Sequence, residues 1–233
     1  MKPLRYIILT FTFCTLTTMQ AQNSIPSTSE RYVPKAIDLG LPSGTLWADR
    51  NMAVNDKASD FGDYYSWGST VSSQDASLSQ NLFSWRGYKY GNGPKALTKY
   101  CTDNIFGKKD GKTKLEPDDD AASSYAQTHK VPFWDAKWHI PTADEFAELI
   151  EKCKWTWTSG GYQVTGPNGK SIFLPAAGME GHTLLGTGNY WTSTLCDDFP
   201  CYAYAIIFDD EFIAWNNASR FSGYSIRPVR SKK

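Results

Sequence analysis

One helix signal constrains this chain more than any other feature of its sequence. Thr142 and Glu145 have the spacing of a capping box, in which each side chain bonds to the backbone of the other residue. Apolar residues follow at helical spacing and mark one buried face: Phe146, Leu149, Ile150 and Cys153. The sequence therefore predicts an amphipathic helix from about Thr142 to Cys153.

Short strands follow this helix to the end of the chain. Apolar and polar residues alternate in them, and turn residues such as Pro167-Asn168-Gly169 separate them. The expected strands are 154–158, 162–165, 171–174, 189–193, 202–208, 212–215 and 224–229, with two earlier ones at 36–39 and 45–48. Strands gathered after helices are typical of an α+β domain with an antiparallel sheet.

Residues 49–120 are mostly polar and turn-forming, so we expect ordered loops there. A second helix is expected to open at Pro117, because Asp118, Asp119 and Asp120 would then lie at the positive end of the helix dipole. The alternative for these three carboxylates is a calcium site, although they lack the ligand spacing and the glycine of an EF-hand.

The N-terminus has the order of an export signal. Basic Lys2 and Arg5 precede a short apolar run at 6–19, and Ala21 supplies the small residue before a cleavage site. The apolar run is too short to span a bilayer, and no later segment is apolar enough, so no transmembrane segment is expected. The expected organisation is a signal peptide, a flexible linker and one folded domain, at residues 1–21, 22–35 and 36–233.

Cleavage of this signal would leave a secreted, periplasmic or surface-attached protein. A lipoprotein is not expected, because Phe11-Thr12-Phe13 before Cys14 lacks the small residues that precede a lipid-modified cysteine. The chain carries 24 basic and 24 acidic residues, and losing Lys2 and Arg5 would leave a formal charge of −2. No basic stripe is present to neutralise phosphates, so nucleic acid is not an expected partner.

The sequence lacks the common enzyme motifs. It contains no nucleophile elbow, no phosphate-binding glycine loop and no metalloprotease histidine pair. Its three histidines, His129, His139 and His182, are scattered and do not have the spacing of metal ligands. No catalytic residue, metal site or cofactor is therefore expected, apart from the calcium alternative above.

Seven segments, taken together and in order, resemble a known family. They are DLGLPSGTLW at 38–47, GDYYSWG at 62–68, LEPDDDAA at 115–122, WHIPT at 138–142, FLPAAG at 173–178, YWTS at 190–193 and SIRPV at 225–229. This set resembles the Fibrobacter succinogenes major paralogous domain, a family of exported bacterial surface proteins, over residues 36–229. The biochemical role of that family is largely undefined.

The resemblance implies a C-type-lectin-like α+β fold with two helices, a small twisted antiparallel sheet and long ordered loops. The same fold occurs in formylglycine-generating enzymes and in ligand-binding proteins diversified by retroelements. In these lectin-like relatives, the region just before the closing strand presents side chains on an outer surface. The resemblance implies the fold only, because proteins that share a fold can differ in function. The function has to be inferred from the residues of the site.

The resemblance therefore directs attention to residues 209–221. Trp215 would provide an apolar platform, Asn216 and Asn217 would hydrogen-bond a ligand, and Arg220 would present a charged fork. The expected ligand-binding residues are Asp210, Trp215, Asn216, Asn217, Arg220 and Phe221. The alternative is a hairpin in which Phe212 and Trp215 turn inward and ordinary polar residues face outward.

The four cysteines of the mature chain are disulfide candidates: Cys101, Cys153, Cys196 and Cys201. An even count in an exported protein favours disulfides, and four cysteines allow three connectivities. Cys196 and Cys201 enclose a loop short enough for a local bridge, which leaves Cys101 as a partner for Cys153. Formylglycine-generating enzymes carry a redox-active, copper(I)-binding pair at the spacing of Cys196 and Cys201, which raises an enzymatic alternative.

The expected function is non-catalytic recognition of a glycan or a protein at the bacterial cell surface, through residues 196–221. The first alternative is a formylglycine-generating-enzyme-like oxidoreductase that uses Cys196 and Cys201. The second is a structural envelope or fimbria-associated subunit, which an exposed, unpaired edge strand would favour.

Overall fold

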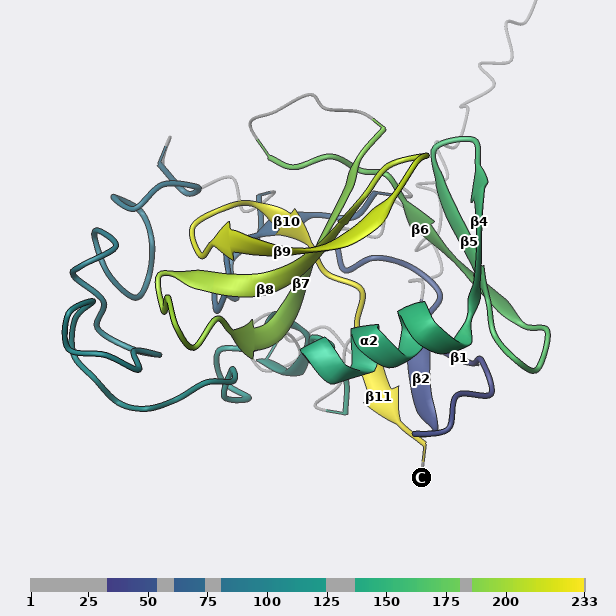
Figure 1. Cartoon of the computed structure of the whole chain (residues 1–233), viewed down its shortest axis with the longest axis horizontal. Coiled ribbons are helices and arrows are strands. Elements are labelled where there is room, and N and C mark those ends of the chain that lie inside the picture. The colour runs from purple at the N-terminus through teal and green to yellow at the C-terminus, as the bar shows by residue number, and fades with distance from the viewer. Residues whose placement is uncertain (1–32, 54–60, 74–80, 125–136, 181–185, 233) are drawn as a thin grey trace, which may run out of the picture. The chain divides into compact units, whose positions relative to one another are not determined.

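A computed structural model describes residues 33–53, 61–73, 81–124, 137–180 and 186–232 (Figure 1). The expected signal peptide and nearly all of the expected linker lie outside these ranges, as do Cys14, His129 and His182, so the predictions about them stay predictions.

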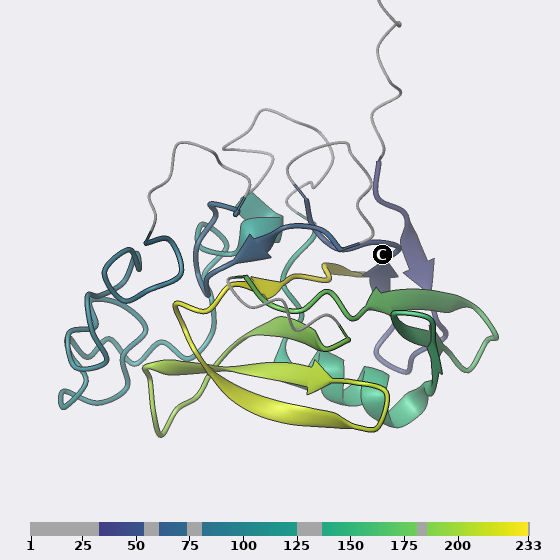
Figure 2. The same ribbon diagram turned by 90° about the horizontal axis from the view of Figure 1, so that it is seen from above.

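The described chain is α+β and builds three small sheets rather than the single sheet expected (Figures 1 and 2). The first sheet joins β1 (Ala36–Asp38), β2 (Thr45–Ala48) and β11 (Val229–Ser231), so it brings the start and the end of the fold together. The second is a meander of β4 (Lys154–Thr158), β5 (Gly161–Thr165) and β6 (Ser171–Pro175).

The third and largest sheet has the order β3-β10-β7-β8-β9. Its strands are β3 (Tyr64–Tyr65), β10 (Tyr224–Ser225), β7 (Gly188–Leu195), β8 (Tyr202–Phe208) and β9 (Ile213–Ser219). All its pairs are antiparallel except β10 with β7, which is parallel. Among the strands described, β9 lies at one edge of this sheet.

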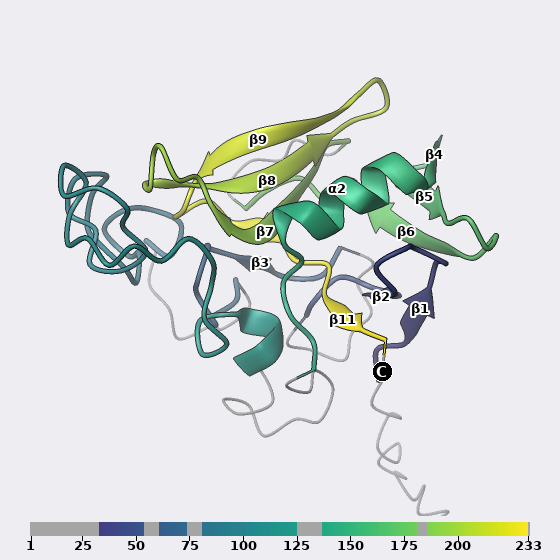
Figure 3. The same ribbon diagram turned by 60° about the horizontal axis from the view of Figure 1, so that its bottom comes forward.

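Helix α2 (Ala143–Lys152) confirms the helix expected from the capping box. Thr142 Oγ1 accepts a hydrogen bond from the Glu145 backbone N–H at 3.2 Å, and the Thr142 N–H donates to Glu145 Oε2 at 2.8 Å. Phe146 and Leu149 are buried on the inner face. Through this face the helix packs against β7 and β8 (Figure 3).

The second helix begins later than expected. Residues 121–124 are helical, whereas Pro117, Asp118 and Asp119 lie in a turn before the helix. Asp120 is the capping residue, since its Oδ1 accepts from the Ala122 N–H at 2.9 Å and from the Ser123 N–H at 3.1 Å. The acidic run therefore does not form a first helical turn. The three carboxylates have separate surroundings.

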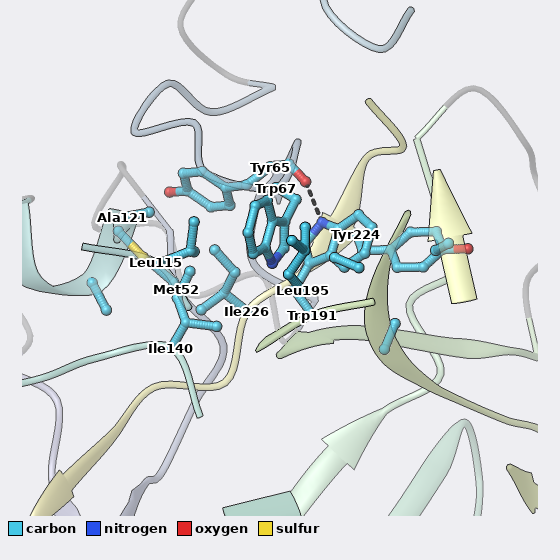
Figure 4. Close-up of a cluster of buried hydrophobic side chains, with 14 of the residues drawn as sticks. Met52, Tyr65, Trp67, Leu115, Ala121, Ile140, Trp191, Leu195, Tyr224 and Ile226 are labelled. Carbon is cyan, nitrogen blue, oxygen red and sulfur yellow. Dashed lines mark hydrogen bonds between the residues drawn. The ribbon is translucent and has the colours of Figure 1, made fainter. Parts of the chain in front are cut away.

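Two apolar cores hold the sheets together. In the first, Trp191 stacks on Tyr224 at a centroid distance of 4.6 Å, and its Nε1 donates to the Tyr65 carbonyl oxygen at 2.7 Å (Figure 4). In the second, Phe146 of α2 packs with residues of β5 to β8 and contacts Trp47 of β2, with ring centroids 5.0 Å apart. The large sheet separates the two cores, because its successive side chains alternate between its faces.

The long loops are held by one buried arginine. Arg220 is 0% exposed, and its guanidinium donates hydrogen bonds to the Tyr88 hydroxyl at 2.8 Å and to three backbone carbonyls at 2.8–3.0 Å. These carbonyls belong to Lys99, Tyr100 and Pro200. The rings of Trp67 and Tyr88 lie about it, with centroids 4.9 and 5.1 Å from the guanidinium carbon.

Replacing Arg220 with lysine should destabilise the fold by about 3 kcal/mol, because an ammonium cannot reach all four acceptors and leaves buried carbonyls unsatisfied. Urea denaturation followed by tryptophan fluorescence measures the change. Arg86→Lys, at an exposed position, is the matched control and should be neutral. Equal stability of the two variants would contradict the anchoring role of Arg220.

Candidate functional site

The β8–β9 hairpin has two different faces. Directly opposed residues of an antiparallel pair share a face, and the register opposes Ala203 to Ala218 and Tyr204 to Asn217. Ala203, Ala205 and Ala218 are buried in the first core and define the inner face. Tyr204 and Asn217 therefore lie on the outer face.

The outer face is covered at one end only. Near the β8–β9 turn, Ile206, Phe208 and Ile213 pack into the second core, beneath α2 and the β4–β6 meander. Toward the β7–β8 turn the same face is open, and there it carries the side chains of Tyr202, Tyr204, Trp215 and Asn217. We call these four residues the aromatic face.

The rings of the aromatic face form a platform beside an amide. Tyr204 and Trp215 meet edge to face, with centroids 6.5 Å apart and planes at 81°. Trp215 is 44% exposed and Tyr202 is 36% exposed, so both present ring surface to solvent. Asn217 is exposed and lies directly opposite Tyr204 in the ladder, where it offers both a donor and an acceptor.

Carboxylates lie at both ends of this hairpin, and neither β8 nor β9 contains a lysine or an arginine. The Cys196 thiol, partial burial and the nearby carboxylates of Asp197 and Asp198 raise the pKa of the Tyr204 phenol above its ordinary value. Its hydroxyl therefore keeps its proton at neutral pH and remains a hydrogen-bond donor. The opposite turn carries exposed Asp210 and Glu211.

Three of the residues predicted to bind ligand lie at the surface as expected. Trp215 and Asn217 lie on the aromatic face, and Asp210 is exposed in the turn at the far end of the hairpin. The alternative in which Phe212 and Trp215 turn inward is wrong, since they are 45% and 44% exposed. Asn216 lies on the opposite face of β9, where its Nδ2 donates to the Tyr224 hydroxyl at 3.5 Å.

The other two predicted residues lie away from the aromatic face. The expectation that Arg220 presents a charged fork at the surface is wrong, because its guanidinium is wholly buried among loop carbonyls. Phe221 is half-buried and packs edge to face against Trp85, with centroids 5.2 Å apart. Both residues support the loops behind the hairpin.

Sequence reasoning missed Tyr202 and Tyr204. Their signal was the alternation Tyr202-Ala203-Tyr204-Ala205, which places two large rings on one face of a strand and two small residues on the other. Small residues suit the face that packs on the stacked Trp191 and Tyr224 rings. The rings of Tyr202 and Tyr204 therefore project from the outer face.

The acidic run at 118–120 does not converge on one point. Asp119 accepts hydrogen bonds from Lys89, Lys99, Tyr90 and Tyr100, and this set, opposing the effect of burial, lowers the pKa of its carboxyl. Asp120 points into the protein, whereas Asp118 is exposed. Within the described ranges, no group of three His, Cys, Asp or Glu side chains is placed to hold a metal.

A cavity of about 300 Å³ lies beside Asp120, and its lining residues are Lys114, Leu115, Pro117, Asp120, Ser123 and His139. The Asp120 and His139 side chains in its lining already have protein partners. Asp120 Oδ2 accepts from the Ile140 N–H at 2.8 Å in addition to its capping bonds, and His139 Nε2 lies 3.0 Å from Glu145 Oε1. These hydrogen bonds stabilise the packing between the two helices, so we assign the cavity a structural role.

All four described cysteines are free thiols in this structure, and the disulfides expected from their even number stay a prediction. Cys101 and Cys201 pack in one small cluster with Leu97, whereas Cys153 packs against the second core. The expected pairing of Cys101 with Cys153 is therefore not supported. Burial raises the pKa of the Cys201 thiol, which disfavours the thiolate that copper-dependent oxidation requires.

No family model, curated protein or solved structure matches this chain. In the described part of the chain, no helix is both long and apolar enough to cross a membrane. The geometry of the aromatic face is therefore the main basis for assigning a function.

The stability of the fold should depend on Asp120 in a pH-dependent way. Burial raises the pKa of its carboxyl to about 6, so folding favours the protonated acid over the ionised one. Its contribution is fully present below its ordinary pKa near 4 and is lost as the pH rises through about 6.

Between pH 4 and pH 7, the stability of the wild type relative to Asp120→Asn should fall by about 2 kcal/mol. Urea midpoints measured at each pH for both proteins give this difference, and Asp118→Asn at an exposed position serves as the control. Parallel pH curves for wild type and Asp120→Asn would show that this carboxyl titrates normally.

Proposed function

We propose that this chain is an exported, C-type-lectin-like recognition module that binds a glycan on the aromatic face. The observation that carries the proposal is the pair of exposed Trp215 and half-buried Tyr204 on the open end of the outer face, beside Asn217. The seven segments that resemble the Fibrobacter succinogenes major paralogous domain support the fold and the surface location.

The chemistry of the face favours a glycan over a protein. A sugar ring has an apolar side that packs on an aromatic ring and a rim of hydroxyls that need hydrogen-bond partners. Trp215 supplies the ring surface, while Asn217 and the tyrosine hydroxyls can both donate and accept. The face carries no formal charge and consists of few residues, which suits a short oligosaccharide better than a standard protein interface of about 800 Å² per partner.

The surrounding charge restricts the glycan further. Asp197 and Asp198 influence Tyr204 electrostatically, and the far turn adds Asp210 and Glu211. These carboxylates can accept hydrogen bonds from sugar hydroxyls, and they repel uronates and sulfated sugars. The proposed ligand is therefore a neutral glycan.

A panel of neutral polysaccharides in affinity gel electrophoresis identifies the ligand, and calorimetry with its oligosaccharide then measures affinity. Trp215→Ala should weaken binding about 30-fold, which corresponds to about 2 kcal/mol for a central aromatic anchor. Phe173→Ala removes another exposed ring, on β6, and should leave the affinity unchanged. Unaltered binding by Trp215→Ala would remove the aromatic face from the site.

Asn216 and Asn217 offer a matched pair on the same strand. Asn217→Ala should weaken glycan binding several-fold, because it removes a hydrogen-bonding amide from the aromatic face. Asn216→Ala should leave the affinity intact, because that side chain lies on the inner side near Tyr224. Equal losses of affinity in the two variants would contradict binding on the aromatic face, because only Asn217 lies on that face.

The edge position of β9 favours a second candidate, the structural subunit. Among the described strands, β9 is paired only with β8, so its other side presents backbone groups that a strand of another chain can bond. Light scattering over a range of protein concentrations tests this function. Ordered oligomers that Ser219→Pro abolishes would favour it, because the N–H of residue 219 points away from β8. A monomer at all concentrations would leave the glycan-binding module as the better assignment.

A further inference from the structure

Two segments one hundred positions apart lie side by side behind the hairpin. Arg220 Nη1 donates to the Tyr100 carbonyl at 3.0 Å and to the Pro200 carbonyl at 2.8 Å, so a single nitrogen joins both backbones. A second link is the Thr102 hydroxyl, which donates to the Asp197 carbonyl at 2.6 Å. The loop that contains residue 101 is therefore held against the β7–β8 turn. In Figures 1 and 3 the teal loops lie beside this turn.

Cys101 and Cys201 follow the two carbonyls that Arg220 binds. Both thiols are buried, and they pack with Leu97 in one small apolar cluster that Trp85 and Phe106 flank. The Arg220 charge acts on both thiols. The backbones and the side chains of these two cysteines thus converge on the same small volume.

Cys196 lies near Cys201 and acts electrostatically on the Cys201 thiol, but its own side chain lies on the outer face of the hairpin. Leu195 pairs with Ala203, and both belong to the first core on the inner face. One residue further along, Cys196 turns to the outer face, where its thiol interacts with Tyr204. Cys201 stands two residues before Ala203 and packs with Cys101.

We propose that Cys101 and Cys201 are the native disulfide pair of this protein, and that Cys153 and Cys196 remain thiols. The oxidant is a small-molecule or protein disulfide. One cysteine thiolate attacks it and releases one thiol; the second cysteine then displaces the other thiol from the mixed disulfide. The sum is two protein thiols and one disulfide converted into one protein disulfide and two thiols, with both protons transferred to the leaving sulfurs.

The bridge would lock the loop around residue 101 to the turn that borders the aromatic face. It closes a long loop in sequence, and constraining a long loop removes much of the entropy of the unfolded chain. The loop itself has little regular structure, and in the reduced protein its attachment depends on Arg220 and on apolar contacts. The disulfide would add a covalent link at the same place.

Peptide mapping tests the connectivity directly. The full chain is refolded in a buffer of oxidised and reduced glutathione, alkylated with N-ethylmaleimide under denaturing conditions, and digested without reduction. Mass spectrometry should find the peptide of Cys101 joined to that of Cys201, with Cys14, Cys153 and Cys196 alkylated. A Cys196–Cys201 bridge, any bridge to Cys14 or Cys153, or five alkylated cysteines would overturn the proposal.

Single serine variants give a second readout that does not depend on mapping. Cys153→Ser and Cys196→Ser should keep a urea midpoint that falls when dithiothreitol is added, as in the wild type. Cys101→Ser and Cys201→Ser should lose this response to reductant. Because each protein is compared with itself in the two redox states, an intrinsic loss of stability in a variant does not obscure the result. A response retained in Cys101→Ser would refute the pairing.

Discussion

The buried guanidinium of Arg220 is the interaction on which the long loops depend. Burying a charge is costly unless polar groups surround it, and here four acceptors and a set of aromatic faces do so. The acceptors come from loop segments far apart in sequence, so the loops must take one arrangement to satisfy the charge. Arg227 is a second buried arginine of this kind, and it donates hydrogen bonds to Asn51 Oδ1 and to the carbonyls of Ala48 and Phe173.

The aromatic face exists because the large sheet is covered unevenly. Helix α2 and the β4–β6 meander bury the outer side of the hairpin near its β8–β9 turn, through Phe208 and Ile213. They do not reach the other end, so Tyr204 and Trp215 remain at the surface. The inner side is filled along the same strands by alanines, which leave room for the Trp191 and Tyr224 rings. One hairpin thus contributes to both cores and to the proposed binding surface.

The loop region and the hairpin are physically connected at the β7–β8 turn. Arg220 and Thr102 link the loop to this turn, and Cys101 and Cys201 lie at the same contact. On the other side of the turn, Cys196 and the two aspartates that follow act on Tyr204. The position of this turn, which borders the aromatic face, therefore depends on loop contacts as well as on the strand ladder.

The surface position of Trp215 was expected from the family resemblance. Local patterns were enough to predict helix α2 and most of the strands, because a capping box and alternating residues act over a few positions. They misplaced Arg220, since a charged side chain next to exposed polar residues looks like a surface group until distant carbonyls are brought around it. They also could not show that Asn216 and Asn217 lie on different faces of β9, or that Cys196 and Cys201 pack against different groups. Which side of a strand faces a core depends on what packs there, and that is set by contacts between segments far apart in the chain.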